Sequence, residues 1–164
     1  MTSQDAAFPP RDQVGRSSTY VCIDYEIDGD PQGADPVNLI TEVFLAGGAS
    51  LIDHPLPIVA SFDDAGTAME AAVVAQWRTQ REINDATRKL RVGVHLGELA
   101  EAIVVMKCAN GNQIVFSGTV DLATDGTLDA RPMALLQFAA GPTQLWLSTD
   151  SRPDIDGRPL RIPT

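Results

Sequence analysis

One stretch near the middle of the chain constrains the fold more than any other. Pro57 to Phe62 is apolar and β-branched and predicts a strand. From Ala65 to about Lys89, alanine and larger apolar residues recur at helical spacing, with Asp63 or Asp64 as the N-cap. Leu90 to Val94 is apolar on both parities, which predicts a strand in the centre of a sheet. A long helix packed on a sheet is therefore the expected framework.

The rest of the chain supplies shorter elements. Asn110-Gly111 predicts a tight turn between two β-branched runs, and Met133, Leu136 and Ala139 follow helical spacing. The expected order is β-α-β-β-α-β-β-β-α-β, an α+β fold of ferredoxin-like type, with an antiparallel-rich sheet and helices packed on one face. The additional elements are a strand at 18–24, a helix at 37–45, a strand at 51–53, a β-hairpin of 103–108 and 113–120, a helix at 128–140 and a strand at 144–148.

Length and charge limit the classes of function. The 164 residues suit one domain at 18–150, between a flexible leader at 1–17 and a polar tail at 151–164. A net charge of −10 opposes binding to nucleic acid or anionic membranes. No signal peptide and no apolar run of membrane-spanning length is visible, so a cytoplasmic protein is expected. Cys22 and Cys108 form no CxxC pattern and are expected to be buried free thiols.

The middle of the chain also resembles a known family. Ala60-Ser61-Phe62, the alanine-rich helix after it, and Arg91-Val92-Gly93-Val94-His95-Leu96-Gly97-Glu98 are similar to the central part of class III nucleotidyl cyclase homology domains. A weaker similarity covers 134–137 and 140–148. The resemblance implies a cyclase-like fold that pairs head to tail, either with itself or with another cyclase-like domain. We expect the hairpin at 104–120 to be the dimerisation arm.

The resemblance also implies where catalytic residues should lie. Such cyclases bind two divalent metals, Mg or Mn, through two aspartates, one at the end of the first strand and one in the following hairpin. Asp24 matches the first aspartate, whereas Leu56 occupies the second position and Ile52 the position of a purine-selecting lysine. The asparagine that orients the ribose and the arginine that stabilises the transition state fall on Arg131 and Leu135.

These replacements predict a catalytically degenerate cyclase-like protein that acts, if at all, through dimerisation or ligand binding, with no cofactor expected and a nucleotide as a possible ligand. One alternative is an active adenylate or guanylate cyclase, with Asp24 and Asp53 as metal ligands and Arg131 as a substitute catalytic residue. Another is an unrelated ferredoxin-like domain that senses a ligand.

Two other groups of residues have simpler explanations. Asp24, Glu26 and Asp28, followed by Asp35, resemble a calcium loop, but a strand enters them where such a loop needs a helix. A solvated acidic strand end is the preferred interpretation, with a cation site as the alternative. His95 is expected to be a hydrogen-bonded structural residue rather than a general base.

Overall fold

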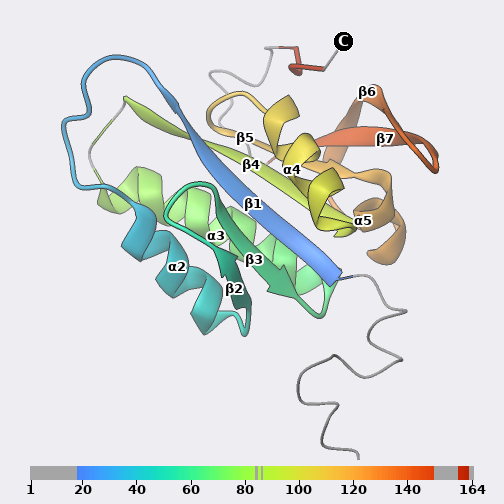
Figure 1. The fold of residues 1–164 in the computed structure, drawn as a ribbon, viewed down its shortest axis with the longest axis horizontal. Helices are drawn as coiled ribbons and strands as arrows, with labels where there is room; N and C mark the ends of the chain where they lie inside the picture. The colour runs from blue at the N-terminus through green and yellow to red at the C-terminus, as the bar shows by residue number, and fades with distance from the viewer. Residues whose placement is uncertain (1–17, 84, 86, 150–158, 163–164) are drawn as a thin grey trace, which may run out of the picture.

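The computed structural model describes residues 18–83, 85, 87–149 and 159–162, which form a seven-stranded sheet and four helices (Figure 1). The strand order is β2-β3-β1-β4-β5-β7-β6, so that β2 and β6 are the two edges. The strands are β1 (Ser18–Ile27), β2 (Ser50–Asp53), β3 (Ile58–Phe62), β4 (Arg88–Gly97), β5 (Gln113–Ser117), β6 (Ala130–Phe138) and β7 (Gly141–Ser148). The helices are α2 (Val37–Ala46), α3 (Ala65–Glu82), α4 (Leu99–Cys108) and α5 (Gly118–Ala123).

Helices α2 and α3 cover one face of the sheet. Alternate residues of the central strands, such as Val21 and Ile23 of β1 and Val92 of β4, point to this face and are fully buried there. The strands and helices predicted for residues 18 to 94 are confirmed, although α3 ends at Glu82 and β1 continues to Ile27. The largest core cluster therefore belongs to the part of the chain whose periodicity is clearest.

Helix α4 lies on the opposite face, and it corrects the predicted hairpin of 103–108 and 113–120. Residues 99–108 are helical, and β5 pairs with β4 in parallel, with Arg91 opposite Gln113. A parallel pair needs a crossover connection, which α4 provides. Ile103, Val104 and Val105 favour a strand locally, but burial of the opposite sheet face selects the helix.

The end of the chain contains a second correction. Residues 130–138 form the edge strand β6 instead of part of a helix at 128–140. β6 forms an antiparallel hairpin with β7, closed by a turn at 139–140 before Gly141. Pro132, which lacks an N–H group, is tolerated because β6 is an edge strand.

Both cysteines are buried free thiols, as predicted. Burial raises the pKa of the Cys22 thiol to about 12 and that of Cys108 to about 11. The leader at 1–17 and most of the polar tail lie outside the described residues. Leu160 and Ile162 pack against the cluster under α4, and the Arg161 N–H donates to the carbonyl of Cys108 at 2.7 Å. Among the described residues, no helix is both long and apolar enough to cross a membrane.

Candidate functional site

The end of β1 lies beside the β2–β3 turn, which is the arrangement that the predicted catalytic site requires. β1 and β3 are antiparallel, and their register ends with Ile23 opposite Ile58. Asp24 is therefore next to the turn that contains Leu56. Asp24 is half-buried, and its Oδ1 accepts a hydrogen bond from the backbone N–H of Tyr25 at 2.8 Å. One carboxylate thus stands at the expected position.

The neighbouring positions provide no second ligand beside it. Leu56 is 43% exposed at the turn, and Ile52 is 48% exposed on β2, where the register with β3 is irregular. Asp53 is opposite Val59, which is itself opposite Cys22, so β3 separates Asp53 from β1. Two strand spacings place the backbones of Asp53 and Asp24 roughly 10 Å apart or more. The two side chains do not form a compact pair of ligands.

Arg131 and Leu135 lie at the other edge of the sheet. Both belong to β6, and β4, β5 and β7 separate that strand from β1. Leu135 is 65% exposed. Within one chain, neither residue can join Asp24 in a single site, because strand spacing alone separates them by roughly 20 Å. The helix on which both residues were expected is absent at these positions.

The acidic residues that suggested a calcium loop do not converge. Asp35 accepts hydrogen bonds from the hydroxyl of Tyr25 at 2.7 Å and the backbone N–H of Val37 at 2.9 Å. Burial and the hydrogen bond to Asp35 raise the pKa of Tyr25. Glu26 instead accepts from the backbone N–H of Gly111 on the other side of the sheet. These carboxylates fix loops to the sheet instead of surrounding a cation.

The Arg91–Glu98 segment holds helix α4 against the sheet. Arg91 donates from Nε to the carbonyl of Ala109 and from Nη2 to that of Lys107, both at 2.9 Å, which satisfies carbonyls at the C-terminus of α4. Burial, followed by the nearby charge of Arg161, lowers the pKa of Arg91. A Cβ atom at Gly93 would lie 2.4 Å from the backbone of Met106, so α4 can cross β4 only over a glycine.

His95 completes this attachment. Its ring is 2% exposed, with Nδ1 2.7 Å from Oγ of Ser117 and Nε2 3.0 Å from Oε1 of Glu101 in the first turn of α4. Ser117 is fully buried, and Glu101, which is 24% exposed, covers the other side of the imidazole ring. The prediction of a hydrogen-bonded structural histidine is confirmed.

Solved structures provide an independent comparison. An adenylate cyclase from Trypanosoma brucei, analysed in its monomeric state, superposes with a TM-score of 0.70 and 14% identity over 95% of this chain and 98% of that chain. The adenylyl cyclase CyaB from P. aeruginosa superposes with a TM-score of 0.66 and 15% identity, over 85% of this chain and 96% of that chain. A non-canonical dimeric guanylyl cyclase domain from Blastocladiella emersonii superposes with a TM-score of 0.61 and 12% identity, over 82% of this chain and 96% of that chain. The fold is that of adenylate and guanylate cyclase domains.

No family model and no curated protein sequence matches the chain. The fold-level similarity agrees with the sequence resemblance at Ala60–Phe62 and Arg91–Glu98, and these segments form β3 and β4 as expected. Helix α4 was missed from sequence, although Ala102, Val105 and Met106 recur at helical spacing.

Within this cyclase-like fold, the residues at the end of β1 do not fit a two-metal site. Such a site needs at least two carboxylates that share both ions, and Asp24 has no such partner at the adjacent turn. Among the described residues, no group of three or more histidine, cysteine, aspartate or glutamate side chains is arranged to hold a metal. Asp24 is therefore a single carboxylate at this position, beside an apolar turn residue.

Proposed function

We propose that this protein is a catalytically degenerate cyclase-like domain, which acts through self-association or ligand binding instead of cyclising nucleotides. The observation that carries this proposal is Leu56, an apolar side chain in the turn beside Asp24, where a second carboxylate would be required. A leucine cannot coordinate a cation, and loss of one such electrostatic contribution reduces turnover by roughly 10³-fold.

The position of the catalytic arginine supports the same proposal. A pair four residues apart on a helix presents both side chains on one face, but positions 131 and 135 are in a strand, with a register irregularity between Pro132 and Ala134. The helix between β5 and β6 is α5, and the corresponding pair at its end is Asp121 and Asp125. Carboxylates there would repel a triphosphate. The second position of the pair is Leu135 in the first correspondence and Asp125 in the second, so neither places an arginine there.

The active-cyclase alternative is favoured by one observation, the half-buried Asp24 carboxylate next to the β2–β3 turn. A turnover assay separates the two proposals. We expect purified protein with ATP or GTP and excess Mn²⁺ to form no more cyclic nucleotide than the Asp24→Ala variant. Clear turnover that disappears in Asp24→Ala would contradict the proposal. Thermal shifts with each nucleotide then show whether binding persists without turnover, which we expect if a nucleotide is the ligand.

A further inference from the structure

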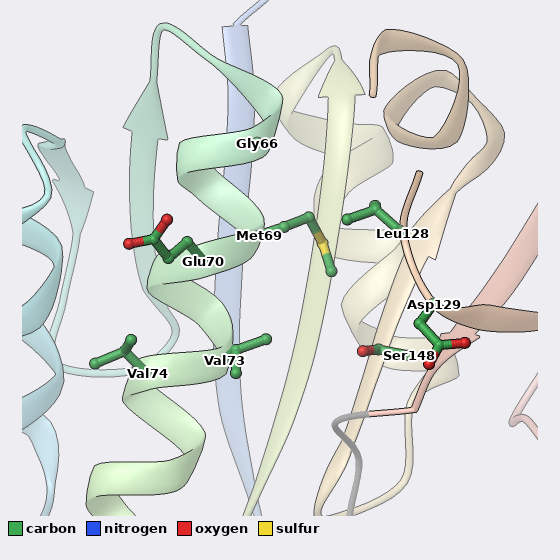
Figure 2. A pocket seen from close by; sticks show the side chains of 8 residues that line it. All are labelled: Gly66, Met69, Glu70, Val73, Val74, Leu128, Asp129 and Ser148. Carbon is green, nitrogen blue, oxygen red and sulfur yellow. The ribbon is translucent and has the colours of Figure 1, made fainter. Parts of the chain in front are cut away.

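The outer side of α3 carries a stripe of four residues. Glu70, Val74, Trp77 and Arg81 follow one another at helical spacing, which places them along one side of the helix. Val74 is half-buried, while Glu70, Trp77 and Arg81 are exposed, Trp77 to 54%. Figure 2 shows Glu70 and Val74 on the side of α3 that is turned away from Met69. The stripe is therefore an open surface with an apolar centre and a charge at each end.

The other side of α3 extends this apolar centre. A cavity of about 300 Å³ opens between α3 and the chain segments that enter β6 and leave β7 (Figure 2). Met69 and Val73 of α3 line it together with Leu128. Val73 precedes Trp77 by one helical turn, so the indole lies next to the mouth of the cavity. An exposed large aromatic side chain within an apolar surface is typical of a protein interface.

The two charges of the stripe are available for pairing. Glu70 has no hydrogen bond or ion pair among the described residues. The guanidinium carbon of Arg81 lies 4.7 Å from the ring centroid of Trp77, whereas the neighbouring Arg78 pairs with Glu82 at 2.5 Å. A guanidinium that stacks on an aromatic ring keeps its N–H donors at its edge, where they can bind a carboxylate. One available acid and one available base thus stand at opposite ends of the stripe.

The order of these residues is self-complementary. Two copies of α3 can pack antiparallel about a two-fold axis that passes between Val74 and Trp77. Glu70 of each copy then faces Arg81 of the other, because this pair has the same midpoint along the helix. Parallel packing would instead bring like charges together. The net charge of −10 opposes association at long range, so that pairing needs such local complementarity, and physiological salt screens the long-range repulsion.

We propose that the stripe is an interface for a second copy of this chain, in which two α3 helices pack antiparallel with Trp77 at the centre and a Glu70–Arg81 ion pair at each end. None of the four residues lies in an edge strand, so this contact is separate from head-to-tail pairing and from the proposed loss of cyclase activity. Four side chains from each copy bury less than about 1,200 Å², which is typical of a weak interface. We expect a Kd of about 1 mM.

The test uses the full chain with Leu135→Asp, which places a charge on the edge strand β6 and disfavours pairing through the sheet edges. Pulsed-field-gradient NMR measures translational diffusion from about 50 µM to about 2 mM protein in about 150 mM salt, where we expect dimers to form. Glu70→Arg or Arg81→Glu alone brings like charges together at both ends and should raise the Kd about tenfold. Glu70→Arg/Arg81→Glu restores opposite charges and should return the Kd to within about threefold of its original value.

A matched control changes the net charge elsewhere. Asp30→Arg alters it as much as Glu70→Arg does, at an exposed residue outside α3, and should leave the Kd within about twofold. Trp77→Ala removes the apolar centre and should abolish the concentration dependence of diffusion. Diffusion that does not change up to about 2 mM would overturn the proposal, as would dimerisation that survives Trp77→Ala. So would a charge-swapped double variant as weak as the single variants, or an equal loss of affinity in Asp30→Arg. Melting curves of each variant verify that it is folded.

Discussion

At the scale of single residues, Gly93 shows why the Arg91–Glu98 segment marks a fold without marking a reaction. An added Cβ would lie 2.4 Å from both Cα and N of Met106, which are backbone atoms that cannot move aside individually. Arg91 and His95, two positions before and after it, bond to the end and to the beginning of the same helix. The segment is thus required wherever α4 crosses β4 at this distance, with or without catalysis.

Substitution Gly93→Ala should destabilise the protein by about 3 kcal/mol or more, because α4 must shift away from the sheet. Urea unfolding followed by circular dichroism measures the loss. Gly66→Ala is the matched control, since Gly66 lies in α3 and its added Cβ would meet no backbone atom within 4 Å, only Oδ2 of the capping Asp64 at 3.2 Å. We expect the control to stay within about 1 kcal/mol of the wild type. Equal losses in the two variants would contradict this account of α4.

At the scale of elements, α3 begins at a side-chain cap. Asp64 accepts hydrogen bonds from the backbone N–H of Thr67 at 2.8 Å and from its hydroxyl at 2.9 Å. These bonds lower the pKa of Asp64 below its ordinary value of 3.8. The contribution of the cap is therefore present above pH 3.8 and is lost as the pH falls through the lowered pKa.

Substitution Asp64→Ala should lower the free energy of unfolding by about 1 kcal/mol at pH 7. The difference from the wild type should shrink as the pH falls below 3.8. Asp63→Ala removes the same charge one residue earlier, at an exposed side chain with no hydrogen bond among the described residues, and should be nearly neutral. Denaturant unfolding at several pH values provides the measurement. A loss in Asp63→Ala equal to that in Asp64→Ala would assign the effect to general electrostatics instead of the cap.

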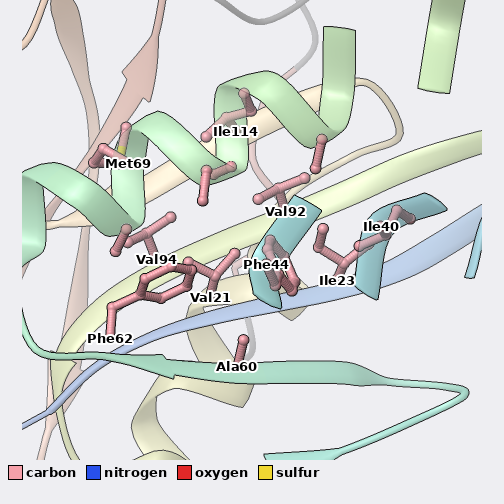
Figure 3. Packing of buried hydrophobic residues seen from close by; sticks show 14 of the residues in the cluster. Val21, Ile23, Ile40, Phe44, Ala60, Phe62, Met69, Val92, Val94 and Ile114 are labelled. Carbon is pink, nitrogen blue, oxygen red and sulfur yellow. The ribbon is translucent and has the colours of Figure 1, made fainter. Parts of the chain in front are cut away.

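Elements whose own periodicity matches their burial were predictable from sequence. α3 contributes Met69 to the core cluster that also contains Val92, Val94 and Ile114 of the sheet, and the alanine-rich face of α3 is visible in the sequence (Figure 3). The position of Asp24 beside the β2–β3 turn was predictable too, because one antiparallel register fixes it.

The predictions for two elements were wrong, because tertiary contacts override the local preference of the sequence. The β-branched Ile103-Val104-Val105 run favours a strand, yet a parallel β4–β5 pair requires a crossover there. In and just after β6, Met133, Leu136 and Ala139 follow a helical period, but pairing with β7 makes residues 130–138 a strand. The proposed correspondences of Arg131 and Leu135 depended on that helix, so the remote half of the candidate site could not be predicted.

At the scale of the whole molecule, large apolar side chains are exposed at both ends of the sheet. Ile52 and Leu56 lie at the β2–β3 end, while Leu122 of α5 and Leu135 of β6 lie toward the other end and are 78% and 65% exposed. The expected arm at 104–120 is wrong, because these residues form α4, the buried strand β5 and the beginning of α5. The β6–β7 hairpin, which projects from the body in Figure 1, replaces it as the candidate arm.

We expect two chains to pair head to tail, with the β6 edge of each against the β2–β3 turn of the other, since a closed two-fold dimer satisfies both surfaces. Sedimentation equilibrium should detect the dimer at about 100 µM, a concentration at which even a weak interface is populated. Leu135→Asp should shift the population to monomer, because a carboxylate buried in the interface is costly. Leu45→Asp introduces the same charge at an exposed leucine of α2 and should leave the dimer intact. A monomer at every concentration, or equal dissociation by both variants, would contradict the head-to-tail arrangement.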